Sequence, residues 1–154
     1  MSLQNMIDMA IKTELLENSF ALLKQQELQF SDCFYRTLFS DYPQVQPLFA
    51  HTNMEEQPKK LFASLVLVVN NLAKPDVLTA ALTGLGTRHV KYGVLPEHYP
   101  MVGGTLLKCM AATLQSQWTD DVSQAWAEAY GTITEIMLEG TDYGDEILHP
   151  EMVA

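Results

Sequence analysis

Histidine is the residue type in this 154-residue sequence best suited to bind a metal or a metal-containing cofactor. The four histidines are His51, His89, His98 and His149, and none has another histidine four positions away. The sequence also lacks a His-Glu-x-x-His segment and a clustered set of carboxylates, so a zinc or di-iron site is not expected. A histidine of this chain would therefore act as a single imidazole ligand.

His89 is the strongest candidate for that ligand. It lies near the end of a predicted helix that carries Leu78, Leu82 and Leu85, so its ring is expected to point toward the core. A lone histidine on an apolar face most commonly serves packing alone. However, His89 and Gln57 are both expected to point inward, each from a different apolar helix. Two such helices would leave a flat slot between them. A haem fits such a slot, because its ring is buried by hydrophobic contact and its iron takes one neutral imidazole.

Other classes of function find little support in the sequence. Glycine-rich phosphate-binding loops and a Gly-x-Ser-x-Gly elbow are absent. The formal net charge of −10 argues against nucleic acid and anionic membrane surfaces as partners, since both need basic patches. The longest apolar run, residues 61–69, is too short to span a bilayer.

The cysteines and the start of the chain predict a cytoplasmic protein. Cys33 and Cys109 are far apart in sequence, have apolar neighbours and form no Cys-x-x-Cys pair, so buried free thiols are expected. The first residues lack the basic-then-apolar pattern of a signal peptide.

Apolar residues recur at intervals of three and four along most of the chain, which predicts an all-α fold. The valine-rich residues 65–69 could form a strand, but their flanks are helical and nothing nearby would pair with them. Residues 1–11 are predicted to be an N-terminal extension, 12–139 one domain and 140–154 an acidic tail. The predicted helices cover residues 12–39 (with Tyr35 on the part from 25), 58–72, 76–92 and 119–140. A further helix is predicted to start at Pro96 or Pro100 and to carry Val102, Leu106, Met110 and Leu114.

Four stretches of the sequence carry a family resemblance. They are residues 34–39 (Phe-Tyr-Arg-Thr-Leu-Phe), residues 43–49, residues 88–103 (beginning Arg-His-Val-Lys-Tyr-Gly) and residues 125–131 (Ala-Trp-Ala-Glu-Ala-Tyr-Gly). The chain resembles the globins over roughly residues 12–139, most of all the haem domain of bacterial flavohaemoglobins and the single-domain bacterial globins. This resemblance implies a globin fold, a three-over-three helical sandwich that encloses haem b (iron protoporphyrin IX).

The resemblance also implies a role for individual residues. His89 matches the proximal iron ligand, and Phe49 matches the phenylalanine that stacks on the haem edge. Tyr35 and Gln57 match the distal residues that face a bound gas, and Leu61 matches the apolar residue over the iron. Gln57 and Leu61 are four residues apart, so they share one helix face.

Further residues would surround the haem by the same resemblance. Arg88 and Lys91 flank His89 and either reach the haem propionates or remain in solvent. The complete set of additional haem contacts is Phe34, Leu65, Leu85, Arg88, Lys91, Tyr92, Val94, Tyr99, Val102 and Leu106.

The sequence departs from the flavohaemoglobin pattern at three points. It ends at Ala154 without flavin- and nicotinamide-binding domains, so a separate reductase is expected to supply electrons. Tyr99 matches the tyrosine that polarises the proximal histidine, but the position of the accompanying glutamate falls near Tyr143, with Glu139 or Asp142 as alternatives. Pro58 directly follows Gln57, which places Gln57 at a helix cap and predicts a more mobile side chain.

Two distal donors predict slow release of O₂. Bound O₂ carries partial negative charge, and two hydrogen bonds to it would contribute on the order of 2–3 kcal/mol. That energy corresponds to release roughly 30- to 150-fold slower than from an apolar pocket. Slow release favours chemistry on bound O₂, namely conversion of nitric oxide to nitrate, and binding of O₂, NO, CO and sulfide is expected. The alternatives are an oxygen transport, storage or gas-sensing globin without turnover, and a haem-free globin-fold interaction module.

Overall fold

The computed structural model describes residues 2–139 and residue 141. This part of the chain is helical throughout, with short turns between helices. The elements are α1 (Leu3–Lys24), α2 (Glu27–Asp41), the 3-10 segment η1 (Pro43–Phe49), α3 (Gln57–Asn70), α4 (Pro75–Lys91), α5 (His98–Leu114), the 3-10 segment η2 (Gln115–Gln117) and α6 (Asp120–Glu139).

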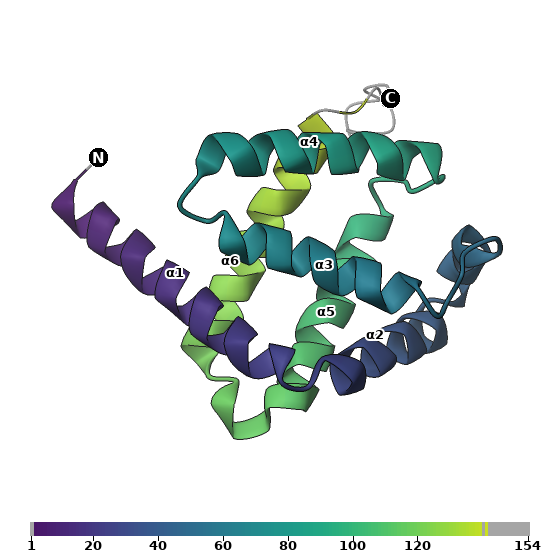
Figure 1. The fold of residues 1–154 in the computed structure, drawn as a ribbon, viewed down its shortest axis with the longest axis horizontal. Helices are drawn as coiled ribbons and strands as arrows, with labels where there is room; N and C mark the ends of the chain where they lie inside the picture. The colour runs from purple at the N-terminus through teal and green to yellow at the C-terminus, as the bar shows by residue number, and fades with distance from the viewer. Residues whose placement is uncertain (1, 140, 142–154) are drawn as a thin grey trace, which may run out of the picture.

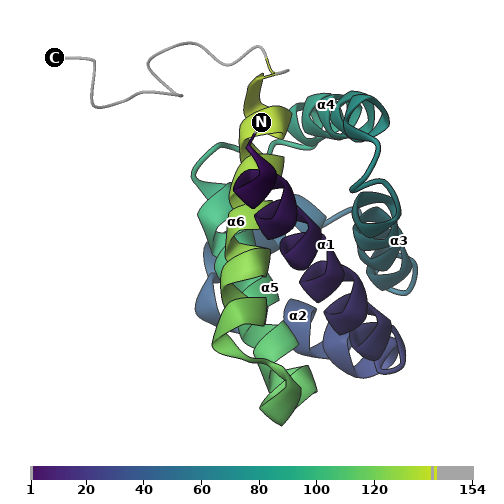
Figure 2. The same cartoon turned by 90° about the vertical axis from the view of Figure 1, so that its left-hand side faces the viewer.

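The α-helices form two layers. In one view α1, α3 and α4 lie in front of α5 and α6 (Figure 1). Turned by 90°, α3 and α4 lie on one side of the molecule while α5 and α6 lie on the other (Figure 2). This arrangement confirms the predicted three-over-three helical sandwich.

The helices α3 and α4 are consecutive in the chain but are held by different neighbours. α3 packs against α1 and α2, whereas α4 packs against α6. Among the described residues, α3 and α4 are not one of the helix pairs in extensive backbone contact. The two helices can therefore flank a slot without collapsing onto each other.

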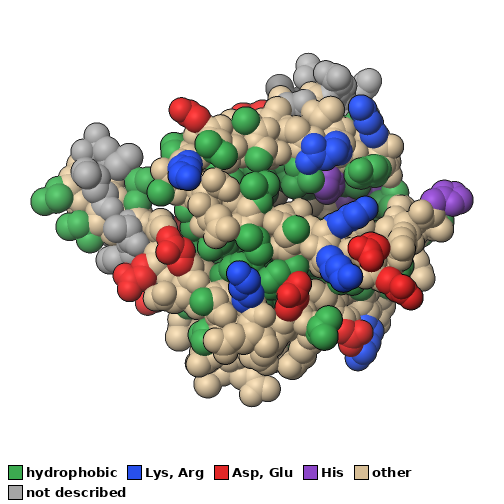
Figure 3. Space-filling model, in the orientation of Figure 1, with side chains coloured by type: hydrophobic (Ala, Val, Ile, Leu, Met, Phe, Trp, Pro, Cys, Tyr) green, Lys and Arg blue, Asp and Glu red, His purple; other side chains and the backbone are tan. Residues whose placement is uncertain are grey.

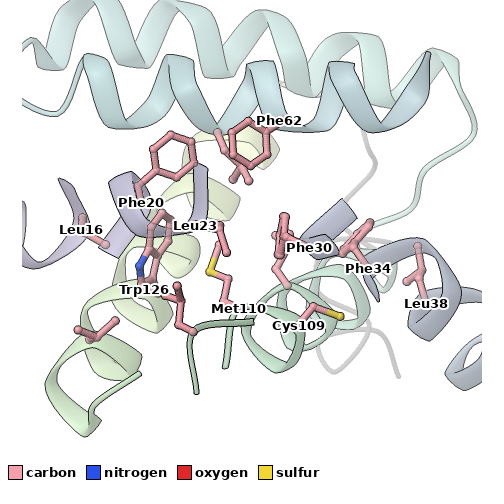
Figure 4. Packing of buried hydrophobic residues seen from close by; sticks show 14 of the residues in the cluster. Leu16, Phe20, Leu23, Phe30, Phe34, Leu38, Phe62, Cys109, Met110 and Trp126 are labelled. Carbon is pink, nitrogen blue, oxygen red and sulfur yellow. The ribbon is translucent and has the colours of Figure 1, made fainter. Parts of the chain in front are cut away.

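The main hydrophobic core joins helices of the two layers. Aromatic rings from three helices meet there: Phe20 stacks on Phe62 at 5.1 Å between centroids, and Trp126 lies 6.5 Å from Phe20 (Figure 4). The indole N–H of Trp126 donates a hydrogen bond of 2.8 Å to the hydroxyl of Ser19. This bond gives the buried indole N–H an acceptor, so burial of the large ring leaves its polar group paired.

A close approach between two backbones fixes the position of α4. A Cβ atom at Gly86 would lie 2.2 Å from the carbonyl oxygen of Met137 on α6. Only glycine allows α4 and α6 to come this near. Leu82 and Met137 are buried beside this crossing together with Val68 from α3. The crossing lies one turn before His89 and therefore sets where that residue sits.

Most of the predicted helices are confirmed, with two differences at the N-terminal end. α1 begins at Leu3 rather than near residue 12, because the Ser2 hydroxyl accepts a hydrogen bond from the N–H of Asn5 and caps the helix. The predicted helical stretch 12–39 is also interrupted between Lys24 and Glu27, where α1 ends and α2 begins in a new direction. The predicted tail, 140–154, lies outside the described residues except for Thr141.

The valine-rich segment 65–69 is helical, as predicted, and belongs to α3. Nowhere in the described range does a helix have both the length and the apolar character needed to cross a membrane.

Candidate haem site

His89 lies near the end of α4, with its imidazole partly buried. Its Nδ1 atom is 2.8 Å from the backbone carbonyl oxygen of Leu85. Because a carbonyl only accepts hydrogen bonds, Nδ1 carries the ring proton and Nε2 keeps its lone pair. Burial lowers the pKa of His89, the hydrogen bond to Leu85 opposes this change, and the charge of Arg88 adds to it. His89 therefore presents a neutral imidazole in the tautomer that binds iron.

The end of α4 holds His89 in place. The carbonyl oxygen of His89 accepts hydrogen bonds from the backbone N–H groups of Tyr92 (3.1 Å) and Val94 (3.0 Å). Gly93 between them has a φ of +86°, a conformation that side-chain-bearing residues rarely adopt. This turn stops the helix directly after the histidine and leads the chain toward α5.

Tyr35 is the best-placed polar side chain on α2. Its hydroxyl donates to the backbone carbonyl oxygen of Gln57 across 3.4 Å. Burial raises the pKa of Tyr35 to about 12, with a smaller lowering effect from the Gln57 side chain. Tyr35 consequently keeps its proton at neutral pH and remains a hydrogen-bond donor.

Gln57 occupies a slightly different place from the one predicted. Glu56 takes the N-cap position of α3, and Gln57 is the first residue inside the helix, followed by Pro58. The backbone N–H of Gln57 donates to the carbonyl oxygen of Asn53 across 3.0 Å, because the preceding turn continues into the helix. The backbone of Gln57 is thus held at both its N–H and its carbonyl group, while its side chain is partly exposed.

Three aromatic rings surround Tyr35. The ring centroid of Phe34 is 4.9 Å away and that of Phe49 is 5.9 Å away, both in edge-to-face geometry. Phe39 lies 6.1 Å away and also contacts Phe49. These contacts fix the orientation of the Tyr35 ring. They also bring together three of the predicted site residues, Phe34 and Tyr35 from α2 and Phe49 from η1.

The remaining apolar side chains predicted to contact haem fall into two packed groups. Those in or against the main core are Phe34, Leu61, Leu65, Val102 and Leu106. Those of the second group, which contains Val68 and Leu82, are Leu85, Val94 and Tyr99.

A hollow between α3 and α4 opens to the surface in Figure 3. Hydrophobic side chains line it, a histidine is visible inside, and Lys and Arg side chains gather around its edge. Arg88 and Lys91 are both exposed, and so is Tyr92, whose ring is 64% exposed and 6.2 Å from that of His89. A flat apolar cofactor with acidic edge groups would suit this combination of apolar walls and basic rim.

Tyr99 is buried beside the proximal candidate. Its ring centroid lies 6.4 Å from that of His89, with 33° between the two planes. Glu139, one alternative for the polarising carboxylate, is exposed at the end of α6. Asp142 and Tyr143 lie outside the described residues, so the identity of a carboxylate partner stays a prediction.

Two features of the site were not found from the sequence. The backbone carbonyl of Leu85 orients His89, although Leu85 was predicted only as an apolar contact. Its position four residues before a helical histidine was the available signal, since that carbonyl lies on the same face. Val68 on α3 and Leu82 on α4 lie in the same buried cluster and were recognised only as helix-face positions.

The residues of this site fit a haem. One neutral imidazole is oriented by its backbone acceptor, and two hydrogen-bonding groups, Tyr35 and Gln57, lie together at the start of α3. Among the described residues, no group of three or more His, Cys, Asp or Glu side chains could hold a metal ion. A haem iron needs only one protein ligand, and the oriented imidazole of His89 suits that role.

Known proteins are similar to this chain in sequence and in fold. A family model described as Globin matches residues 32–137. A flavohemoprotein of Pseudomonas aeruginosa is 35% identical over 112 residues, which cover 71% of this chain and 28% of that protein. An uncharacterized globin-like protein of Aquifex aeolicus is 32% identical over 124 residues, which cover 80% of this chain and 87% of that protein. The chain spans about a third of the length of the flavohemoproteins it matches.

Two solved structures have the same helical arrangement. A bacterial globin from Campylobacter jejuni has a TM-score of 0.71 and 28% identity, with 85% of this chain and 94% of that one covered. An engineered carbene transferase from Rhodothermus marinus, provisionally described as a nitric oxide dioxygenase, has a TM-score of 0.73 and 28% identity, covering 82% and 87%. With the family model matching more than half of its length, the chain belongs to the globin family.

Proposed function

We propose that this protein is a haem b globin that binds O₂ and related ligands (NO and CO, with sulfide as a further candidate) and converts nitric oxide to nitrate. The observation that carries the proposal is the pairing of the Tyr35 hydroxyl with Gln57 at the start of α3. When bound, the haem would supply the iron at which O₂ and nitric oxide react. His89 would hold that iron from α4 through Nε2.

Tyr35 and Gln57 would act on the gas ligand. In the structure the Tyr35 hydroxyl donates a long hydrogen bond of 3.4 Å to the backbone carbonyl oxygen of Gln57. A ligand with partial negative charge is a better acceptor than a neutral carbonyl, so the hydroxyl would turn toward it. Together with the amide of Gln57, this would retain O₂ and slow its release.

Retention of O₂ suits the oxidation of nitric oxide better than delivery of O₂. The net reaction takes one NO, one O₂ and one electron to one nitrate ion, so each turnover consumes an electron. The description of the Rhodothermus marinus neighbour supports this chemistry, and the name of the flavohemoprotein relatives supports a haem that works with a flavin. We propose a separate cytoplasmic reductase as the electron donor.

The basic rim of the hollow suits both an acidic cofactor edge and an acidic donor surface. Exposed Lys60, Arg88 and Lys91 belong to the helices α3 and α4 that flank the hollow, and Lys59 on α3 forms an exposed ion pair with Glu56. The chain as a whole has 9 Lys and Arg against 19 Asp and Glu, so this positive region contrasts with the rest of its charge. Electrostatic attraction would bring an acidic reductase to the exposed haem edge.

The proposal is tested by sustained turnover. Haem-loaded protein, NADH and a generic flavin reductase are supplied with O₂ and pulses of nitric oxide, and both nitric oxide and nitrate are measured. We expect many equivalents of nitrate per protein, one for each nitric oxide consumed. Tyr35→Phe should lower the rate several-fold, whereas Tyr42→Phe, which alters a tyrosine at the end of the same helix, should not.

Two results would favour the alternative functions. A single equivalent of nitrate without further turnover, although the reductase keeps the iron ferrous, would indicate a carrier, storage or sensing globin. Failure of the purified chain to bind haem at all would indicate a haem-free interaction module.

A further inference from the structure

The two cysteines lie side by side although they are distant in sequence. Cys33 on α2 and Cys109 on α5 have their Sγ atoms 2.8 Å apart, across a separation of 76 positions. Both are free thiols, as predicted, but the prediction that both are buried is wrong for Cys33. A disulfide bond needs a sulfur–sulfur distance of about 2.05 Å, so less than ~1 Å of movement would join them.

The two thiols differ in their access to solvent. Cys109 is completely buried, whereas Cys33 is partly exposed. The hydroxyl oxygen of Thr37 lies 3.8 Å from the Cys33 sulfur, on the same face of α2. Burial and the contact with Cys33 raise the pKa of Cys109 to about 12, with Thr37 acting in the opposite direction. A reagent from solvent would therefore meet Cys33 first.

We propose that Cys33 and Cys109 form a reversible intramolecular disulfide that joins α2 to α5, by exchange with a low-molecular-weight disulfide. The Cys33 thiolate attacks one sulfur of the small disulfide, so that a mixed disulfide forms and one small thiolate leaves. The Cys109 sulfur then attacks the Cys33 sulfur, releases the second small thiol and passes its proton to solvent. Overall, two protein thiols are oxidised and one small disulfide is reduced to two thiols.

The position of the pair gives the bond a structural consequence. Cys33 is two residues before Tyr35 on α2, and Cys109 is three residues after Leu106 on α5. A bond between these helices would restrict the helix that carries the distal hydroxyl. It would also close a long loop of chain, which limits the unfolded state. The inference rests on the geometry of the sulfur pair and holds whether or not the protein oxidises nitric oxide.

The experiment uses the full haem-loaded chain and bis(2-hydroxyethyl) disulfide, a small and uncharged oxidant that an acidic protein does not repel. After incubation, the protein is denatured, free thiols are alkylated, and intact mass and peptide masses are measured. We expect loss of two hydrogen atoms, no alkylation, and a peptide pair linked through Cys33 and Cys109. The melting temperature should rise by on the order of 10 °C and return after dithiothreitol.

Cys33→Ser provides the control, because it changes the partly exposed thiol and leaves the buried one in place. This variant should show no linked peptide and no shift in melting temperature with the oxidant. A stable mixed disulfide on Cys33, a disulfide-linked dimer, or two thiols that remain open to alkylation would each overturn the proposal.

Discussion

The hydroxyl of Tyr35 and the backbone carbonyl of Gln57 are 3.4 Å apart, so the two residues proposed to face the gas ligand already touch in the structure. This bond is at the long end of hydrogen-bond geometry and is correspondingly weak. Little free energy is lost when the hydroxyl leaves it for a better acceptor. The Tyr35 ring is meanwhile held by Phe34, Phe39 and Phe49.

The first prediction concerns the separate effects of these two donors on O₂ release. Tyr35→Phe should speed O₂ dissociation by roughly tenfold or more, which matches the loss of a bond of about 1.5 kcal/mol. Gln57→Leu should have a smaller effect, because the Gln57 side chain is partly exposed and its order is lower. Stopped-flow dissociation measurements on both variants and on their combination provide the test.

The combination of the two changes checks whether the donors share one acceptor. If both bind the same oxygen atom, the effects of the double variant should be less than additive. A larger effect of Gln57→Leu than of Tyr35→Phe would contradict the assignment and would make Gln57 the ordered distal donor.

The second prediction concerns stability in alkali. The pKa of Tyr35 is about 12 in the folded protein and about 10 in an unfolded chain. Below pH 10 both states keep the proton, and the contribution of Tyr35 to stability is fully present. Between pH 10 and 12 only the unfolded state ionises, so the free energy of unfolding falls by up to about 2–3 kcal/mol.

Tyr35→Phe removes that ionisation and should flatten the decline between pH 10 and 12. The measurement is urea unfolding of the carbon monoxide-bound protein from pH 9 to 12. Because the other tyrosines titrate equally in both proteins, the difference between the two curves isolates Tyr35. Parallel curves would show that the Tyr35 pKa is not raised by folding.

The third prediction compares two glycines on α4. Gly86→Ala should destabilise the protein by about 2 kcal/mol or more, since the new Cβ would lie 2.2 Å from the Met137 carbonyl oxygen and that backbone must shift. Gly84→Ala is the matched control, because its Cβ would meet only the flexible Arg88 side chain at 3.5 Å. This change should be neutral or stabilising by up to about 1 kcal/mol. Denaturant unfolding measures both, and equal effects would refute the close helix crossing.

The sequence allowed candidate site residues to be selected, but it did not specify how the helices that carry them cross. His89, Tyr35 and Gln57 could be selected from residue type, spacing and family resemblance, because each belongs to a local pattern. The start of α1 at Leu3 depends on a single serine cap that is hard to separate from ordinary surface residues. The contact of Gly86 with Met137 and that of Cys33 with Cys109 depend on helix crossings between distant segments, which periodicity does not specify.

The fourth prediction tests the proximal ligand by mutation. His89→Ala should lose most of the haem, and added imidazole should restore part of it by filling the space of the missing side chain. The melting temperature should fall as well, because haem stabilises the native state that it binds. His51→Ala, which changes an exposed histidine of the loop after η1, should retain haem and stability. Full haem occupancy of His89→Ala, measured by absorption and metal analysis, would show that the ligand is misassigned.

The absorption spectrum of the ferrous, ligand-free protein reports whether one or two histidines bind the iron. Helix α3 carries no histidine and His51 lies in the loop before it, so among the described residues we assign His89 as the iron ligand. We expect a Soret band and a five-coordinate, high-spin spectrum with one histidine ligand. A low-spin spectrum with two histidine ligands, or the absence of bound haem, would contradict it.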